Sequence, residues 1–166
     1  MIVPAKISDV IELANAMRAA DRKELIELTA QTPYWAAEQS FSRSDVAFSA
    51  RSPAGELLTM FGARRDNLIE ETAVIWSLST EAVDRNRIHF VRNTKTGFEM
   101  LARSMPDVEQ FHNFVSLDYR GAVRWIELIG GSISVRPPLS GVCGGRFAEF
   151  WIINPFYNGR GKTTCA

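Results

Sequence analysis

Hydrophobic and polar residues change their spacing along the chain, and these changes predict an alternation of strands and helices. The strongest strand signal is TAVIWSLS, residues 72–79, because it is apolar almost throughout and contains β-branched and aromatic residues. The segment FHNFVS, residues 111–116, carries bulky side chains on both sides, so we expect a strand covered on both faces. Shorter patterns predict further strands in MIVPA, in residues 45–50, in LLTMFGA closed by Gly62, in GSISVRP and in RFAEFWII.

Apolar residues at helical spacing predict two helices near the start of the chain. The first has Ser8 as its N-cap and Asp9 in its first turn, followed by Val10 and Met17 on the inward face. The second begins near residues 21–22, and the proline of QTPYWAAEQSF is expected to end it.

Two more helices are predicted in the second half of the chain. One starts after TAVIWSLS and is stopped by Pro106. Its inward stripe is expected to consist of Ile88, Val91, Phe98, Leu101, Ala102 and Met105. The other covers DYRGAVRWIELIG, with Asp118 as its cap and Ala122 and Ile126 facing a sheet. Gly130 is suited to the left-handed conformation that ends a helix.

These elements give the order β-αα-β-β-β-α-β-α-β-β, which predicts a mixed α/β sheet of about seven strands with helices on both faces. We expect one domain over residues 1–152. Residues 153–166 are rich in glycine and polar residues and are expected to form a flexible C-terminal tail. Phe156 and Tyr157 leave open whether this tail is a disordered end or a segment that docks on a partner.

Composition and charge exclude several classes of function. Lys+Arg and Asp+Glu number 19 each, so the formal net charge is zero, which argues against a general nucleic-acid binder. No stretch approaches the ~20 apolar residues of a membrane span. The two cysteines form no metal cluster or disulfide framework and fit a reducing cytoplasm. Cys143 is either a small turn residue or a nucleophile, and His112 either a half-buried strand residue or a catalytic one.

The segment FHNFVS and the helix after it resemble a motif of the GNAT superfamily of acyl-CoA N-acyltransferases. In that motif a strand is followed by the pattern N-x-x-A-x-x-L-Y-x-K-x-G-F and then by another strand. With the glycine placed on Gly130, Ala122 falls on the alanine of the motif, Trp125 on its leucine and Gly131 on its aromatic residue. The resemblance implies a GNAT-like fold and acetyl-CoA as the cofactor.

A second resemblance covers most of the chain. The segments MRAADRKEL, GELLTMFGA, TAVIWSLST, FVSLDYRGAVRWIELIGG and GGRFAEFWI occur in this order. They resemble a tailed-phage family related to internal virion protein A of short-tailed coliphages, a family that is itself regarded as GNAT-like. This resemblance implies a bacteriophage protein located in the host cytoplasm or the virion interior, with phage structural proteins as partners if the chain is not an enzyme.

The GNAT resemblance also implies roles for particular residues. The acyl donor, acetyl-CoA, would lie between the WSLS and FHNFVS strands. These two strands are expected to separate after IWSLS. Glu70 or Glu71 would act as the base through water, and Tyr119 as the acid. The cofactor-binding residues would be Trp76, Ser77, Leu78, Ser79, Arg85 and Arg87. No metal site is expected.

Two departures from the GNAT pattern leave two functions open. The best match to the pyrophosphate loop, RNTKTG at residues 92–97, has Lys95 in place of the inner glycine and lies inside a predicted helix. Ile126 occupies the usual tyrosine position. The chain is therefore either an N-acyltransferase acting on an unknown small-molecule or protein amine, or a GNAT-fold virion or assembly protein that acts by protein contacts.

Overall fold

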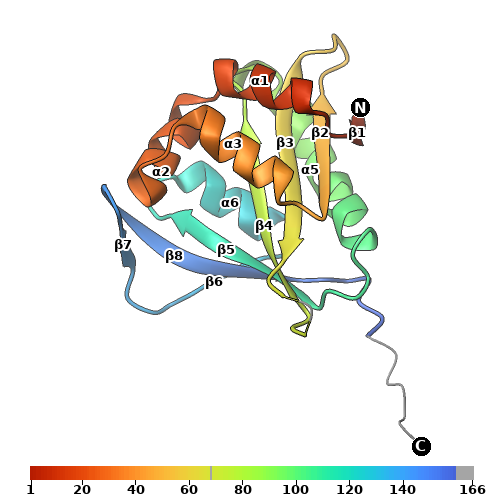
Figure 1. Cartoon of the computed structure of the whole chain (residues 1–166), viewed down its shortest axis with the longest axis vertical. Helices are drawn as coiled ribbons and strands as arrows, with labels where there is room; N and C mark the ends of the chain where they lie inside the picture. Colours follow the sequence, from red (N-terminus) through yellow and green to blue (C-terminus); the bar gives the residue numbers. More distant parts are fainter. Residues whose placement is uncertain (68, 160–166) are drawn as a thin grey trace, which may run out of the picture.

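A computed structural model describes residues 1–67 and 69–159 of the chain. Its strands form one eight-stranded sheet in the order β1-β2-β3-β4-β5-β8-β6, with β7 paired to β8 (Figure 1). Only the β4–β5 pair is parallel among these neighbours. The strands are β1 (Ile2–Pro4), β2 (Val46–Arg51), β3 (Leu57–Arg65), β4 (Thr72–Ser79), β5 (Gln110–Ser116), β6 (Ser132–Ile133), β7 (Leu139–Gly141) and β8 (Gly144–Ile153).

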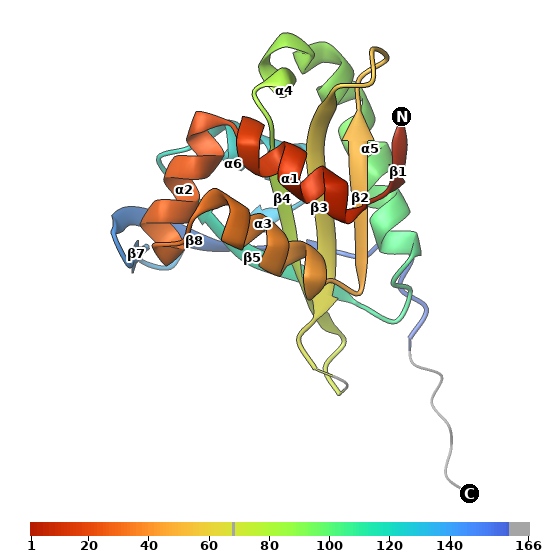
Figure 2. The same ribbon diagram turned by 45° about the horizontal axis from the view of Figure 1, so that its top comes forward.

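Helices cover both faces of the sheet, as the sequence predicts (Figure 2). Helices from the first part of the chain lie on one face, and those that follow β4 and β5 lie on the other. The first group is α1 (Ile7–Ala16), α2 (Ala19–Thr29) and α3 (Pro33–Ser42). The second group is α5 (Arg87–Arg103) and α6 (Arg120–Leu128), and the short α4 (Ala82–Arg85) lies at the end of β4 (Figure 2).

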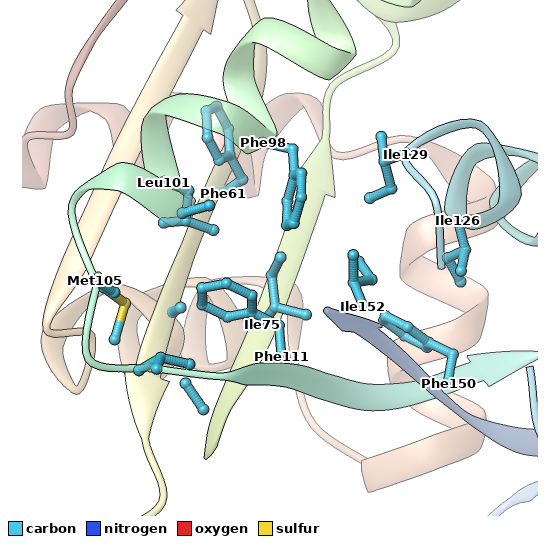
Figure 3. Packing of buried hydrophobic residues seen from close by; sticks show 14 of the residues in the cluster. Phe61, Ile75, Phe98, Leu101, Met105, Phe111, Ile126, Ile129, Phe150 and Ile152 are labelled. Atoms are coloured by element: carbon cyan, nitrogen blue, oxygen red, sulfur yellow. The ribbon is translucent and has the colours of Figure 1, made fainter. Parts of the chain in front are cut away.

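The larger hydrophobic core lies between the sheet and the pair α5 and α6. Phe98 of α5 meets Phe111 of β5 edge to face, with ring centroids 5.9 Å apart (Figure 3). Leu101, Met105 and Ile152 are fully buried in the same cluster. Burying side chains of this size contributes about 1.5–3 kcal/mol each, so this core fixes both helices on the sheet.

The first part of the chain contains a helix that the sequence analysis does not predict. Pro33 begins α3 instead of merely ending the helix before it. Thr32 is the N-cap, and its hydroxyl accepts a hydrogen bond from the Trp35 N–H at 3.3 Å. Proline is well tolerated at the first helical position because the N–H that it lacks has no helical partner there.

Two predicted helix starts also differ from the structure. Helix α1 begins at Ile7 with Lys6 as its N-cap, so Ser8 is not the cap, and Asp9 instead accepts a hydrogen bond from the Lys6 N–H at 3.0 Å. Helix α6 is preceded by Tyr119, and Asp118 forms an ion pair with Arg146 at 2.6 Å instead of capping it.

The predicted end of α6 agrees with the structure, whereas the third predicted helix differs from it. Gly130 has a φ angle of +87°, so the predicted left-handed end of α6 is confirmed. The third helix is divided at Asn86 into α4 and α5. As a result the predicted inward stripe is wrong at its start, since Ile88 and Val91 are 70% and 45% exposed.

Strand β5 is covered less completely than its composition suggests. Phe111 and Val115 are buried against the helices of one face, but Phe114, on the other face, is 38% exposed. The expectation of a strand covered on both faces is therefore wrong for this end of β5. The predicted strand in GSISVRP is only the two-residue β6.

The described part of the C-terminal segment packs on the domain. Strand β8 continues to Ile153, and Asn154 is buried. The Asn154 Nδ2 donates to the backbone carbonyl oxygens of Ala102, Met105 and Val108 at 3.2, 3.0 and 2.8 Å. The guanidinium of Arg103 lies 3.7 Å from the centroid of the Phe156 ring. The rest of the predicted tail, residues 160–166, lies outside the described residues.

We expect Asn154→Asp to lower the free energy of unfolding by about 2–4 kcal/mol, because a carboxylate cannot donate to the carbonyl oxygens that surround it. Urea denaturation measures this change. Asn67→Asp is the matched control, since the Asn67 Oδ1 accepts from the N–H groups of Ile69 and Glu70, which a carboxylate can also do. Equal stability of the two variants would contradict this role of Asn154.

Candidate functional site

Strands β4 and β5 pair for only part of their length. Their register contains three pairs, Thr72 with Gln110, Ala73 with Phe111, and Val74 with His112. Beyond these pairs β4 continues to Ser79 and β5 to Ser116 without pairing to each other. We call the space between the unpaired edges 75–79 and 113–116 the wedge. The predicted separation of the two strands is confirmed, and it begins earlier than expected, directly after Val74.

Asn113 closes the narrow end of the wedge. Its Nδ2 donates to the carbonyl oxygen of Ile75 at 2.6 Å, and its Oδ1 accepts from the Phe114 N–H at 2.8 Å. One side-chain amide thus satisfies a backbone group on each strand at the point where the ladder stops. Buried backbone groups without a hydrogen-bond partner cost free energy. The two hydrogen bonds of Asn113 therefore reduce the free-energy cost of separating the strands.

The edge of β4 that faces the wedge carries a backbone group suited to bind a ligand. In a strand, alternate residues direct their N–H and C=O groups to the same side. The Ile75 carbonyl and both backbone groups of Ser79 bond to partners outside β3, whereas the Leu78 carbonyl bonds to the Thr59 hydroxyl of β3. The alternation therefore directs the N–H and C=O of Ser77 into the wedge.

Helix α2 lies across the wide end of the wedge and bonds to both strands. Asp21 accepts a hydrogen bond from the Ser79 N–H at 2.6 Å, and Glu24 accepts one from the Ser116 N–H at 2.7 Å. The two acidic residues are three positions apart, so they share one face of the helix. The hairpin of β7 and β8 holds the far end of α2, where the Cys143 N–H donates to the Glu27 carbonyl at 3.0 Å.

The environment of these two carboxyl groups shifts their acidity. Burial raises the pKa of Asp21 to about 6, although the hydrogen bond from Ser79 and the charge of Arg18 oppose the shift. Burial raises the pKa of Glu24 to about 7, against the hydrogen bond from Ser116 and with the help of the Asp21 charge. Both groups therefore exchange protons near neutral pH, as a general base should.

Arg18, at the junction of α1 and α2, links three elements beside the wedge. Its Nη2 lies 2.6 Å from the Asp84 carboxylate of α4, and its Nη1 donates to the hydroxyl of Tyr119 before α6. The junction also pairs with the end of β4, because the Arg18 N–H donates to the Ser79 carbonyl at 2.9 Å. Burial and the nearby Asp21 charge raise the pKa of Tyr119 to about 12, so this phenol is protonated at neutral pH.

Tyr119 thus lies at the wedge, but the two predicted bases do not. Glu70 and Glu71 precede β4 at the end where β4 and β5 are paired. Glu71 also accepts a hydrogen bond from the Tyr157 hydroxyl at 2.6 Å. The eight residues from Glu71 to Ser79 span about 26 Å of extended strand, so these carboxylates and Tyr119 are not brought together.

The four residues predicted from IWSLS divide into two groups. Ser77 faces the wedge, and Ser79 lies on the same edge with its N–H already bonded to Asp21. The backbones of Trp76 and Leu78 face β3 by the same alternation. Their side chains pack on the face of the sheet that α1 and α3 cover. On this face the Trp76 Nε1 donates to the Ser44 hydroxyl at 2.8 Å.

Arg85 and Arg87 lie at the start of the helices that follow β4. Both are exposed, and Arg85 bonds to Glu56 at 2.9 Å. Asn86, the N-cap of α5, makes no capping hydrogen bond with its side chain, so the first N–H groups of this 17-residue helix face no side-chain cap there. The segment RNTKTG lies wholly inside α5, as predicted, and is not a phosphate loop.

The remaining candidates lie away from the wedge. His112 is half-buried on β5 at the paired end of the strand, and its Nε2 is 2.7 Å from Asp66. Cys143 is exposed in the turn between β7 and β8. Among the described residues no group of three or more His, Cys, Asp or Glu side chains could hold a metal. Over the same residues no helix has the length and apolar character needed to cross a membrane.

Comparison with solved structures identifies this arrangement. Spermidine N-acetyltransferase from Vibrio cholerae, solved with CoA and spermine, superposes with a TM-score of 0.67 over 93% of this chain and 95% of that one, at 10% identity. The chain has the GNAT fold. Ribosomal-protein-alanine N-acetyltransferase from Brucella melitensis gives a TM-score of 0.66 over 92% and 99% of the two chains, at 10% identity. No protein-family model matches the sequence, and no curated protein matches it.

A third structure agrees with these two. The ribosomal-protein-S18-alanine N-acetyltransferase from Escherichia coli gives a TM-score of 0.61 at 11% identity, with 93% of each chain covered. At these identities the likeness shows the fold alone. The side chains at the wedge of this GNAT-fold protein must therefore be interpreted from their own geometry.

Sequence reasoning missed Arg18, Asp21, Glu24 and Asn113. The available signals were an amide within a predicted strand and two carboxylates at helical spacing. Neither signal locates the wedge by itself, because the position of α2 across the strands depends on tertiary packing.

We expect the free energy of unfolding to fall as the pH rises from about 4 to about 8. Asp21 and Glu24 have folded-state pKa values of about 6 and 7, above the ordinary values of 3.8 and 4.5, so protonation favours the folded state. Each group contributes roughly 3 kcal/mol that is present below its ordinary pKa and lost above the raised one.

The double variant Asp21→Asn, Glu24→Gln tests this expectation, because its amide oxygens still accept the two hydrogen bonds. Urea denaturation at pH 5 and pH 8 should show a smaller pH dependence for the variant than for the wild type. An unchanged pH dependence would contradict the assignment of the raised pKa values to these groups.

Proposed function

We propose that this chain is an N-acyltransferase that transfers the acyl group of acetyl-CoA, or of a close homologue of this thioester, to an amine. One observation carries the proposal: the wedge joins an unpaired backbone edge at Ser77 to two carboxyl groups with pKa values near neutrality, Asp21 and Glu24. Amide formation from a thioester needs a donor for the carbonyl oxygen and a base for the amine, and the wedge offers both.

The residues around the wedge fit a CoA thioester, which supplies an activated carbonyl carbon when bound. The N–H of Ser77 donates to the carbonyl oxygen and stabilises the negative charge that develops on it. The first N–H groups of α5, with Arg85 and Arg87 beside them, are suited to the pyrophosphate. Asp84, which would repel this group, is neutralised by Arg18.

The carboxyl groups of α2 are placed to accept the proton that the amine loses. Glu24 has the pKa closer to neutrality and accepts the proton as the amine attacks, either directly or through one water molecule. The C–S bond breaks as the C–N bond forms, and the thiolate that leaves takes a proton from Tyr119. Solvent then returns the proton from Glu24 to Tyr119, so that the products are an amide and free CoA. Arg18 holds the Tyr119 hydroxyl in place.

We expect Glu24→Gln to lower kcat/KM by about 10²–10⁴-fold, the usual contribution of a general base. The measurement is release of free CoA thiol from acetyl-CoA, with spermidine and an N-terminal alanyl peptide as amines. These probes follow from the spermidine and ribosomal-protein-alanine N-acetyltransferases that share the fold. In the wild type the rate should rise with pH through an apparent pKa of about 7, that of Glu24.

Glu70→Gln is the matched control, because it makes the same change at an exposed position at the other end of β4. Its rate should equal that of the wild type. A Glu24→Gln variant as active as this control would show that Glu24 is not the base.

A second candidate is a GNAT-fold phage protein without catalysis, which acts by contacts with phage structural proteins in the virion interior or during assembly in the host cytoplasm. The link from Arg18 to Asp84 and Tyr119 favours it, because this link ties together the elements between which a thioester would pass. The exposed acidic Glu81 just before α4 favours it as well.

Thermal unfolding with CoA separates the two candidates. A ligand at 100 times its Kd stabilises the folded protein by about 2.7 kcal/mol, so an enzyme should show a rise of several degrees in Tm. The non-catalytic candidate instead requires no shift with CoA or acetyl-CoA, together with presence of the protein in purified virions.

A further inference from the structure

A cavity lies beside the wedge, between α5 and the sheet. Its volume is about 40 Å³. Its walls come from β1, β2, β3, β4, α5 and α6, and most of them are apolar, with Phe61, Ile75 and Phe98 among the lining side chains (Figure 3). One part of the wall is polar, where the hydroxyls of Thr59 and Ser77 lie 3.2 Å apart. An apolar cavity of this kind favours hydrocarbon over water.

The cavity adjoins the edge of β4 that faces the wedge. Ile75 and Ser77 belong to that edge, and both also line the cavity. On the opposite wall the Trp125 Nε1 of α6 donates to the Thr94 hydroxyl of α5 at 3.2 Å, and both residues line the cavity as well. An acyl group whose carbonyl oxygen is bound at Ser77 therefore has the cavity next to its carbon chain.

A glycine keeps this cavity open. Gly97 lies inside α5, where glycine is less favourable than alanine, and it lines the cavity. A Cβ at this position would lie 3.3 Å from Cζ of Phe61 and 3.5 Å from Cδ1 of Ile2. Even one methyl group would therefore crowd the wall between α5 and the sheet.

We propose that this cavity binds the carbon chain of the acyl group, and that the preferred donor is a short-chain acyl-CoA of the propionyl or butyryl class instead of acetyl-CoA. This inference rests on the proposed function. A cavity needs about 10–15 Å³ of such volume to hold one water molecule, so about 40 Å³ leaves room for one or two methylene groups beyond an acetyl group. The apolar wall then determines the length of the chain.

The affinity of the protein for CoA thioesters of increasing length tests the proposal without an amine. Isothermal titration would compare CoA with acetyl-, propionyl-, butyryl- and hexanoyl-CoA. Burial of each methylene should tighten binding about fourfold, so butyryl-CoA should bind about 15-fold more tightly than acetyl-CoA. Hexanoyl-CoA should show no further gain, because the cavity is filled.

Two substitutions should shift this preference in opposite directions. Gly97→Ala narrows the cavity and should bring the ratio of butyryl to acetyl affinity close to one. Phe61→Leu widens it and should let hexanoyl-CoA bind several-fold more tightly than butyryl-CoA. Lys95→Ala, on the exposed side of α5, is the control and should keep the wild-type ratios. Because each ratio compares ligands on the same protein, a loss of stability in a variant does not change it.

The outcomes distinguish this inference from the proposed function. Equal affinity for all the thioesters, tightest binding of acetyl-CoA, or unchanged ratios in both cavity variants would overturn the inference and leave an acetyltransferase standing. Absence of binding to CoA and to every thioester would overturn the proposed function and this inference with it.

Discussion

The early end of pairing between β4 and β5 is the constraint on which the rest of the site depends. Two neighbouring strands that separate after three pairs leave backbone N–H and C=O groups without a ladder partner. The protein satisfies these groups with side chains: Asn113 at the narrow end, and Asp21 and Glu24 at the wide end. The backbone of Ser77 between them is left facing the wedge. The site that we propose for a thioester carbonyl is therefore a direct result of how the sheet is interrupted.

The buried carboxyl groups of Asp21 and Glu24 carry a free-energy cost for the folded protein. A carboxylate that accepts one backbone hydrogen bond inside the protein loses most of its hydration, which is why burial is the first cause of both raised pKa values. Asparagine and glutamine would accept the same hydrogen bonds without this penalty. The retention of acidic residues is thus better explained by chemistry than by stability, in keeping with the tendency of perturbed pKa values to gather at functional sites.

Local patterns predicted the frame of the molecule and failed where tertiary packing decides. Strand β4 was predicted with its observed bounds because six of its eight residues are apolar or β-branched, and such a run has few alternatives to a buried strand. Gly130 was predicted correctly because a left-handed residue is a local requirement. Pro33 is ambiguous by nature, since proline both ends one helix and begins the next. The prediction that Ile88 and Val91 face the core was wrong, because the break at Asn86 changes which side of α5 faces the core.

The proposed base illustrates the same limit. Glu70 and Glu71 are close to β4 in sequence, but they lie at its paired end. Asp21 and Glu24 are about 55 residues from the end of β4 in sequence and contact the two strand ends directly. Only the packing of α2 across the sheet brings them there, so no pattern within a short window could have selected them.

Arg18 connects helices α4 and α6 to the junction of α1 and α2, which lies on the other side of the sheet. One guanidinium holds α4 and the start of α6, and its own backbone holds the end of β4. Any ligand that displaces α4 or α6 must therefore strain or release the junction of α1 and α2, which directly precedes Asp21 and Glu24 of α2. A ligand that binds one arrangement of this junction better than another thereby links its own occupancy to affinity at Asp21 and Glu24, and such a linkage acts equally in both directions.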